Sequence, residues 1–490
     1  MKLYNGYERL PRNYTLMDDE YEFTMANGYL INEKQDQEAV FDVFFRKVPS
    51  DGGYAVMAGL DKIIPFIENF KFGERELDYF RRKGYDEKFI NYLKNFKFTG
   101  DIYAVPDGTP VFPNEPIVTV KAPLIEAQIV ETAILSIVNG AMEHATGARK
   151  IIEAAPDNVA VMEFGARRAD GCEAAIDASI YGIMAGCKLT SNIIAADMLG
   201  MVAGGTQAHS WIESYPTEFQ AFKAYAKVFP NNCILLVDTI DTLRSGVPNA
   251  IRTFNWMKEN GYPTNNIGIR IDSGDLAYLS KEARKMFDEA GFPQAKICLS
   301  NGLTAENIEK LIAQGAKFDS LGVGDNISKP EGRMGCVYKE VALKENGIWI
   351  PKIKLSNDAI KIVNPDYKKL YRLYDKETGF AMADVMTRQN EVLKKNNMVI
   401  VDTKNPLNRN IVNNYDAVEL QKPIFIGGEL VYNDPDIMEK QEYCNNAMAT
   451  LYPEVKRVTK PHGYYVSGTE DYMNFKENII TKAKQYIKVK

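Results

Sequence analysis

Short apolar runs recur through the middle of the chain from Asn158 onward, and each run ends in polar, glycine-bearing residues. Helix-length segments separate the runs. This alternation predicts parallel strands joined by crossover helices, and six such units favour a (β/α) barrel. An open doubly wound sheet is the structural alternative, because periodicity alone does not distinguish the two. The runs are Val159–Phe164, Gly200–Gly204, Ile234–Asp238, Ile267–Asp272, Lys296–Ser300 and Ser320–Gly324.

The regions on either side of these runs have a different pattern. Residues 1–135 combine a helix-like stretch, Leu16–Leu30, with strand-like stretches at Phe41–Phe45 and Pro116–Val120, which predicts an α/β layer domain. The barrel is then expected over residues 136–350. After about Ile350 the strand rhythm weakens, and helices are expected at Pro435–Met448 and Tyr472–Ile487. We expect residues 351–490 to pack back on the first domain and complete it.

Composition and charge exclude several classes of protein. The chain has 490 residues, 45% hydrophobic and 25% charged, which is typical of a multidomain globular protein. Its net charge of -6 and its dispersed basic residues argue against nucleic acid as a partner. No apolar run approaches the roughly 20 residues of a membrane span, and the N-terminus lacks a signal-like apolar region. We therefore expect a cytoplasmic protein with no membrane partner.

The cysteines and histidines do not have the spacing of a metal-binding site. The six cysteines include no C-x-x-C pair, and Cys233 and Cys298 lie within apolar runs, so they are expected to be reduced core thiols. The three histidines are too scattered for a histidine-rich metal site.

The ends of the apolar runs carry the candidate chemistry, because the carboxyl ends of parallel strands line the active site in either fold. His209 follows a glycine pair just inside an expected helix, whose partial positive charge keeps the imidazole neutral and nucleophilic. Such a ring can accept a phosphoryl group covalently. A packed or capping histidine is the alternative, and the local sequence by itself favours it.

Two carboxylates, Asp238 and Asp241, follow the run that starts at Ile234. They could orient a histidine N–H or hold Mg²⁺ through water, whereas Asp241 could instead cap the next helix. The following run places Arg270 and Asp272 on one face and then opens into Ser273 at a helix start. This pair offers a cation for an anionic substrate and a carboxylate for ribose or metal, with an internal salt bridge as the alternative.

Glycine turns end the last two runs, and an aromatic residue ends the first. The turns hold Asn301 with Gly302 and Gly322 with Gly324, where backbone N–H groups can converge on a phosphate, although glycine often serves only the turn. Neither turn is a dinucleotide fingerprint, and no Walker loop occurs. Phe164 could stack on a flat heteroaromatic substrate while a following arginine meets an anion; core packing of the ring is the alternative.

Together these motifs resemble one family, the nicotinate phosphoribosyltransferases. Glu-Phe-Gly-Ala-Arg-Arg, Gly-Thr-Gln-Ala-His, Leu-Leu-Val-Asp-Thr-Ile-Asp-Thr, Arg-Ile-Asp-Ser-Gly-Asp and Gly-Val-Gly stand in the family order and spacing. The ends of the chain also resemble the family, at Asp19–Met25, Phe44–Pro49 and Pro453–His462. The resemblance therefore covers nearly the whole chain.

The resemblance implies an N-terminal α/β sandwich domain, an irregular (β/α) barrel and a homodimer with a shared active site. It implies formation of nicotinate mononucleotide and diphosphate from nicotinate and 5-phosphoribosyl 1-diphosphate in NAD biosynthesis, with Mg²⁺ and with ATP as co-substrate. His209 matches the histidine that ATP phosphorylates in the family, and Asp238 matches its acidic partner. Tyr21 of the second subunit would stack on the pyridine ring opposite Phe164.

The resemblance also assigns the remaining site residues. Arg270 and Thr206 would contact nicotinate or the sugar phosphate, and Arg167 and Asp272 would lie near the diphosphate and ribose, with Ser273 beside them. The glycine turns would hold the 5-phosphate. Two positions depart from the family pattern: Asp325 stands where many relatives have threonine, and Asn364-Pro-Asp366 stands where Pro-Gly is usual. The second departure puts in doubt the loop around Lys354–Lys361 as a binding element.

Three other functions are considered. A nicotinamide-specific relative would carry an aspartate near Thr190-Ser-Asn192 to accept the amide N–H, and a carboxylate there would repel nicotinate. The quinolinate enzymes are typically shorter and lack the histidine motif. A non-catalytic nucleotide-binding barrel would have little reason to keep the histidine, both carboxylates, Arg270 and the glycine turns together.

Overall fold

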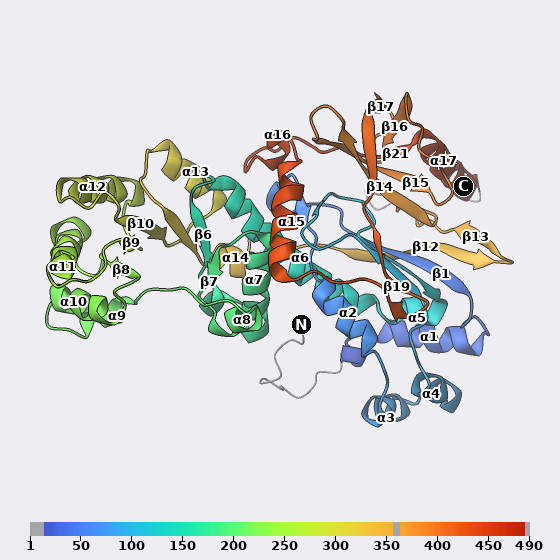
Figure 1. The fold of residues 1–490 in the computed structure, drawn as a ribbon. Helices are drawn as coiled ribbons and strands as arrows, with labels where there is room; N and C mark the ends of the chain where they lie inside the picture. The colour runs from blue at the N-terminus through green and yellow to red at the C-terminus, as the bar shows by residue number, and fades with distance from the viewer. Residues whose placement is uncertain (1–13, 356–362, 486–490) are drawn as a thin grey trace, which may run out of the picture. The chain divides into compact units, whose positions relative to one another are not determined.

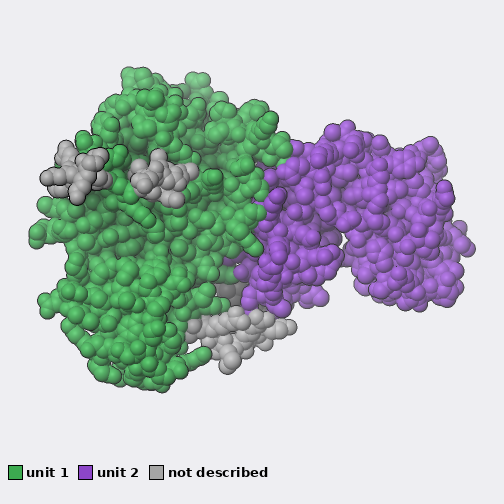
Figure 2. Space-filling view, turned by 180° about the vertical axis from the view of Figure 1, so that it is seen from behind, with its two compact units in different colours: residues 1–143, 332–490 green, residues 144–331 purple. Residues whose placement is uncertain are grey.

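The computed structural model describes residues 14–355 and 363–485. By their internal contacts, these residues form two compact units (Figure 2). Unit 1 combines the two ends of the chain, Met1–Glu143 and Gly332–Lys490, and unit 2 is the continuous segment His144–Glu331. The sequence suggested residues 136–350 for the barrel, so unit 2 is shorter at both ends.

Unit 2 is built around a parallel sheet of six strands in the order β7-β6-β11-β10-β9-β8. The last strand of the unit, β11, pairs with the first, β6, as in a barrel, and the ring is open between β7 and β8. The predicted irregular (β/α) barrel is therefore confirmed, in an open form. Its strands are β6 (Ala160–Glu163), β7 (Leu189–Thr190), β8 (Cys233–Leu236), β9 (Ile267–Ile271), β10 (Lys296–Ser300) and β11 (Ser320–Val323).

One of the six predicted strands is wrong. The run Gly200–Gly204 forms no strand, and the second strand is the two-residue β7 instead. Within this run, Gly204 is the residue that contacts β7: its N–H donates a hydrogen bond to the Thr190 carbonyl over 2.9 Å. Glycine at both ends of the run lowers its preference for an extended ladder, and this leaves the barrel open at that point. The segment from residue 199 to residue 208 runs as an irregular connection between two helices (Figure 1).

Helices follow most of these strands directly, which places the strand ends and the helix starts together. Side chains at several helix starts cap the backbone: Asp275 accepts from Tyr278 N, and Thr304 accepts from Asn307 N. Figure 1 shows the helices on the outside of the sheet. They are α7 (Cys172–Ala185), α8 (Ile193–Met198), α9 (His209–Glu213), α10 (Glu218–Val228), α11 (Val247–Glu259), α12 (Leu276–Glu289), α13 (Ala305–Ala313) and α14 (Asp325–Ser328), with short turns η3 (Ala166–Arg168) and η4 (Thr242–Gly246).

Unit 1 contains a seven-stranded antiparallel sheet in the order β13-β12-β1-β5-β3-β19-β20 and a two-stranded sheet of β2 and β4. The predicted strands Phe41–Phe45 and Pro116–Val120 correspond to β1 and β5 within it. The strands are β1 (Glu38–Phe44), β2 (Ala55–Val56), β3 (Asp101–Ala104), β4 (Pro110–Val111), β5 (Val118–Pro123), β12 (Val337–Glu345), β13 (Ile348–Pro351), β19 (Lys422–Ile426) and β20 (Glu429–Leu430).

A second sheet of six strands lies entirely beyond residue 367, in the order β17-β16-β21-β15-β14-β18. The strand rhythm that weakens in the sequence after about Ile350 gave no indication of this sheet. Charged residues interrupt β14, and three of the five residues of β18 are exposed, so these two strands lack the continuous apolar runs of the barrel strands. They are β14 (Lys368–Asp375), β15 (Ala381–Arg388), β16 (Met398–Asp402), β17 (Arg409–Val412), β18 (Tyr415–Glu419) and β21 (Val466–Thr469).

Helices complete unit 1, and α17 packs on β15, β16 and β21 (Figure 1). The predicted helix at Pro435–Met448 is confirmed as α15; the one at Tyr472–Ile487 is α17, and its last two predicted residues lie outside the described part. The helices are α1 (Glu20–Ile31), α2 (Leu60–Glu68), α3 (Glu74–Lys83), α4 (Glu87–Lys94), α5 (Leu124–Gln128), α6 (Glu131–Ala154), α15 (Ile437–Ala449), α16 (Pro453–Lys456) and α17 (Glu470–Gln485), with η1 (Tyr14–Leu16) and η2 (Pro49–Asp51). Helix α6 continues into unit 2.

One stretch of the described chain, Leu124–Ala154, is long and apolar enough by length and composition to cross a membrane, with a mean hydropathy of 1.3. In the structure, 67% of this apolar window is buried within the protein. That burial is typical of a core helix.

Candidate active site

His209 and Asp238 meet at the open side of the barrel in unit 2. His209 is the first residue of α9, and Asp238 follows β8, so the strand end and the helix start bring the two side chains together. His209 Nε2 lies 3.2 Å from Asp238 Oδ1. The Asp238 side chain is 1% exposed, whereas that of His209 is 39% exposed. A buried, fixed carboxylate therefore holds an imidazole whose other edge can be reached from solvent.

Asp238 is held in turn by the segment after β9. Its Oδ2 accepts from the Asp272 N–H over 3.0 Å and from the Ser273 hydroxyl over 2.6 Å. Three donors therefore fix the orientation of one buried carboxylate. Ser273, which the resemblance assigns to substrate, is used here to position Asp238.

Arg270, on β9, reaches the irregular segment before α9. Its Nη1 donates to Thr206 Oγ1 over 2.9 Å and its Nη2 to the Gln207 carbonyl over 3.0 Å, while its Nε is buried without a hydrogen-bond partner. Among the described residues Arg270 forms no ion pair with a carboxylate, so the salt bridge to Asp272 considered from the sequence does not form. A guanidinium held only by neutral acceptors is well placed to receive an anionic ligand.

The ends of β9 and β10 form the next part of the site. Ser300 donates its hydroxyl to Asp272 Oδ1, which ties the two strand ends together. Asn301 and Gly302 then turn the chain with φ angles of 87° and 60°. Both residues are exposed, and an added Cβ at Gly302 would meet no atom within 4 Å. Their backbone is therefore open to a ligand, as a phosphate-binding turn requires.

Glu163, at the end of β6, anchors the turn that carries Phe164. Its buried carboxylate accepts from the Gly165 N–H and from the hydroxyls of Ser179 and Thr190. Sequence reasoning named Glu163 only as the start of a motif and did not foresee this network. A charged residue directly after an apolar strand was the available signal.

The ring of Phe164 lies against Gly322. A Cβ at Gly322 would stand 2.6 Å from Phe164 Cδ2, so only glycine leaves room for the ring. Gly322 lies within β11 and pairs with Ser300 on one side and Met162 on the other. The expectation that Gly322 forms a turn was therefore wrong: it lies within the strand, and its missing side chain leaves room for the Phe164 ring. Gly324 does end the strand and precedes α14.

Comparison with known proteins fits this arrangement. Residues 16–139 match the profile of the nicotinate phosphoribosyltransferase N-terminal domain, and residues 367–476 match that of the C-terminal domain. The chain is 41% identical over 477 residues to the nicotinate phosphoribosyltransferase of Bacillus subtilis, covering 96% of each chain. The chain belongs to the nicotinate phosphoribosyltransferase family.

More distant relatives agree with the family assignment. The nicotinate phosphoribosyltransferase of Caenorhabditis elegans is 33% identical, covering 96% of this chain and 94% of its own. The crystal structure of human nicotinic acid phosphoribosyltransferase superimposes with a TM-score of 0.81 at 26% identity, covering 94% of this chain and 99% of that chain. Both the N-terminal domain and the barrel-like domain are therefore those of the nicotinate phosphoribosyltransferases.

The structure explains both departures from the nicotinate phosphoribosyltransferase pattern. Asp325 begins α14 and forms an exposed ion pair with Arg168, Oδ1 to Nε, over 3.3 Å. Asp366 has a φ of 78°, in the left-handed region that glycine adopts freely. This backbone conformation explains why glycine is usual at this position in the family. The other expected residue of the η3 turn, Arg167, is exposed.

The magnesium assignment to Asp238 and Asp241 stays a prediction. Both oxygens of Asp238 are occupied as described above, and Asp241 Oδ1 caps η4 by accepting from Leu243 N and Arg244 N over 3.1 and 2.8 Å. Within the ranges 14–355 and 363–485, no three His, Cys, Asp or Glu side chains are grouped to hold a metal ion. These residues do not fit a resident metal cage.

Tyr21 lies on α1 in unit 1 and is 45% exposed. Its hydroxyl has a raised pKa because of partial burial and the nearby Glu131 carboxylate, so the ring is neutral at physiological pH. An exposed aromatic ring can stack on a ligand of another subunit, but this role stays a prediction. Of the Lys354–Lys361 loop, residues 356–361 lie outside the described part.

Proposed function

We propose that this chain transfers the phosphoribosyl group of 5-phosphoribosyl 1-diphosphate to the ring nitrogen of nicotinate, forming nicotinate mononucleotide and diphosphate in NAD biosynthesis. The observation that carries the proposal is the single cluster at the open side of the barrel, His209, Asp238, Thr206 and Arg270, in a chain that belongs to this family. The same cluster argues against a non-catalytic nucleotide-binding barrel, because a protein that only binds a ligand does not need a buried carboxylate hydrogen-bonded to a histidine.

The substrates would be bound mainly by positioning and charge. Arg270 offers an unpaired buried Nε and two further N–H groups to a carboxylate or phosphate, and Phe164 offers a ring face held in place by Gly322. Asp272 and the Asn301–Gly302 turn stand at the neighbouring strand ends, where ribose and phosphate would lie. Orientation and electrostatic stabilisation of the developing charge are then the main contributions to the rate.

ATP would enter the reaction through His209. A carboxylate can only accept a hydrogen bond, so Nε2 of His209 carries the proton that faces Asp238, and Nδ1 keeps its lone pair. Attack of Nδ1 on the terminal phosphorus of ATP forms the N–P bond as the P–O bond to ADP breaks. Water later hydrolyses the phosphohistidine. Asp238 stabilises the positive charge that the ring acquires in the transfer.

Mg²⁺ would arrive with the diphosphate, where it neutralises part of the leaving group's charge. This is how Mg²⁺ commonly binds, through substrate phosphates, waters and one or two carboxylates. Asp272, which ends β9, has an oxygen, Oδ2, that no described hydrogen bond occupies.

The test of the function is an assay for nicotinate mononucleotide with and without ATP. We expect product from nicotinate in both conditions, with stimulation by ATP in the wild type only. His209→Ala should keep a basal rate and lose the stimulation, because the phosphate acceptor is gone. Ser210→Ala, at the next position of α9, serves as the matched control. Stimulation that survives His209→Ala would exclude the phosphohistidine role.

The choice of pyridine is tested by competing nicotinate and nicotinamide in one reaction. Asn192, in the region where a nicotinamide-specific relative carries its aspartate, donates its side-chain N–H to the Ala175 carbonyl and to Ser179 Oγ, both over 3.2 Å. No carboxylate is offered at that position, so we expect nicotinate to be strongly preferred. Equal use of the two pyridines would overturn this assignment.

A homodimer with a shared site is the proposed assembly, because the family resemblance brings Tyr21 of a second subunit to the pyridine ring; Tyr21 belongs to unit 1, whereas the other expected site residues belong to unit 2. Mixing inactive Tyr21→Ala and Arg270→Ala chains should restore activity in the mixed dimer, which has one intact site. Failure to restore activity, with dimers present, would argue that each chain completes its own site. The cytoplasm is the proposed compartment, and all six cysteines, each in the described chain, are free thiols.

A further inference from the structure

Unit 1 contains a cavity of about 520 Å³ between the start of α17, the end of β16 and the loop at Asn364. Its volume is within the range of roughly 300–1,000 Å³ of small-molecule sites. None of the residues assigned above to the nicotinate reaction lines it. The lining residues are Asn114, Asn364, Val401, Thr403, Lys404, Pro406, Arg409, Met473, Asn474, Lys476, Glu477 and Ile480.

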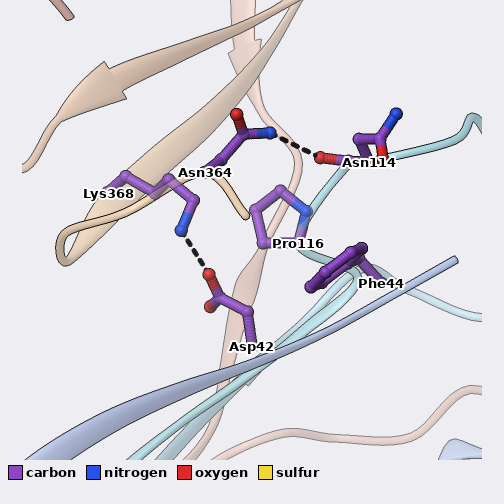
Figure 3. A pocket seen from close by; sticks show the side chains of 6 residues that line it. All are labelled: Asp42, Phe44, Asn114, Pro116, Asn364 and Lys368. Atoms are coloured by element: carbon purple, nitrogen blue, oxygen red, sulfur yellow. Dashed lines mark hydrogen bonds and ion pairs between the residues drawn. The ribbon is translucent and has the colours of Figure 1, made fainter. Parts of the chain in front are cut away.

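Asn364 forms the wall between this cavity and a much smaller one. The small cavity, of about 10 Å³, has room for a single water molecule at most, and Figure 3 shows the six residues that line it. Asn364 donates its side-chain N–H to the Asn114 carbonyl over 3.0 Å, and its Oδ1 accepts from Lys476 Nζ over 2.7 Å. Both the N–H and the oxygen of its side-chain amide are hydrogen-bonded, so the Asn364 side chain is held in one orientation.

Lys476 is the charged group of the inner wall. It is 7% exposed, and among the described residues Asn364 accepts its one hydrogen bond. The neighbouring lysine, Lys368, is neutralised by a buried ion pair with Asp42, seen in Figure 3. Lys476 has no such carboxylate in the described chain. Burial and Lys368 lower the pKa of Lys476 to about 8, which is the effect expected of an ammonium group without a counter-ion.

The rim adds further positive charge, and the floor is apolar. Lys404 is exposed at the rim, and Arg409 is paired with Glu470 over 2.9 Å. Glu477 is the one carboxylate among the lining residues given above, against three cations. Val401 and Met473 are buried in the floor, and Ile480 extends it. An anion with an uncharged, partly apolar body matches this arrangement of charge and surface.

We propose that this cavity binds a small phosphomonoester, with its phosphate on Lys476 and its uncharged body over Val401, Met473 and Ile480. A phosphate group offers three strong acceptor oxygens and nearly two negative charges, enough to engage Lys476 and Lys404 together. The proposal does not rest on the nicotinate reaction, because it uses other residues in the other unit.

Calorimetric titration of the full chain with adenosine 5'-monophosphate, inorganic phosphate and adenosine tests the site. Lys476→Met keeps an unbranched side chain of similar length and removes the charge, and Lys482→Met, at an exposed position of the same helix, is the matched control. We expect a binding event that weakens at least tenfold in Lys476→Met and is unchanged in Lys482→Met. Binding at the nicotinate site would be the same in all three proteins, so the difference isolates this cavity.

A second readout is proton uptake, measured at pH 8 in two buffers of different ionisation heat. The phosphate group is already dianionic at this pH, so binding should raise the protonation of Lys476, and this uptake should vanish in Lys476→Met. Lys404→Met should weaken the same event severalfold, and it serves as an independent variant should Lys476→Met not fold. Identical isotherms in the wild type and Lys476→Met would overturn the site. Equal affinity for adenosine, or for inorganic phosphate, would overturn the phosphomonoester assignment.

Discussion

Replacing Lys476 by methionine should stabilise the protein at neutral pH. The pKa of Lys476 falls from 10.5 to about 8 in the folded chain, and each pKa unit corresponds to about 1.4 kcal/mol. Protonated Lys476 therefore destabilises the folded state by about 3 kcal/mol relative to an exposed lysine. Methionine removes this cost but leaves Asn364 Oδ1 without its donor, a penalty of about 1–2 kcal/mol. The net expectation is a gain of about 1–2 kcal/mol at pH 7.

The sign of this effect depends on pH. Below pH 8 both folded and unfolded chains hold the Lys476 proton, so the full destabilisation is present. Between pH 8 and 10.5 the folded chain loses the proton while the unfolded chain keeps it, so the wild type gains stability as the pH rises. The charged groups around Lys476 are Lys368 with Asp42, and Lys404, Arg409 and Glu477 at the rim. The advantage of methionine should therefore shrink, and then reverse, towards pH 10.

Urea unfolding followed by circular dichroism at pH 7 and pH 10 measures both effects. Lys482→Met, exposed on the same helix, should leave the midpoint unchanged at both values. Lys476→Met should raise the midpoint at pH 7 and lose that advantage at pH 10. A variant that is less stable than the wild type at pH 7, or a difference that does not change with pH, would refute the reasoning.

Three further outcomes are expected. Gly322→Ala should raise the KM for nicotinate, because the added Cβ would stand 2.6 Å from Phe164 Cδ2 and push the ring aside. Gly205→Ala, whose Cβ meets nothing within 4 Å, is the control in steady-state kinetics. Asp366→Gly should leave activity unchanged and shift the unfolding free energy by no more than about 1 kcal/mol. Glycine adopts the positive φ of this position without strain, and this gain offsets the loss of the weak hydrogen bond from Arg388. A large loss of stability would show that the Arg388 contact dominates. Asp384→Ala should destabilise by about 3–5 kcal/mol in urea titration, because Arg372, 0% exposed, loses the carboxylate to which it donates two hydrogen bonds and keeps, within the described chain, only the nearby Glu115 as a counter-charge. A change below about 1 kcal/mol would contradict this.

The sequence was sufficient to predict the barrel and to locate most of its strand ends. Parallel strands buried on both faces must be continuously apolar, so five of the six runs could be located directly. The same rule failed at Gly200–Gly204, which is apolar but forms no strand, because glycine disfavours the extended conformation of a strand. It failed again beyond Ile350, because charged residues interrupt strands such as β14, which then give only a weak apolar signal.

The roles of individual side chains depended on the tertiary structure. The sequence placed His209, Asp238 and Arg270 at one edge of a sheet, since strand ends of a parallel sheet meet there. It offered the capping role of Asp241 as an alternative, because that contact is local. It did not show that Ser273 holds Asp238 or that Gly322 accommodates a ring, because each of these depends on contacts between residues far apart in the chain.

The sequence alone determined the class of fold and located candidate site residues, because apolar periodicity and local motifs are properties of neighbouring positions. The tertiary structure decided which of those residues face one another and which merely support the backbone. It also revealed the Lys476 cavity, whose walls come from segments more than 350 residues apart, Asn114 and α17. A buried lysine looks like any surface lysine in the sequence, and only burial without a counter-ion gives it a distinct chemistry.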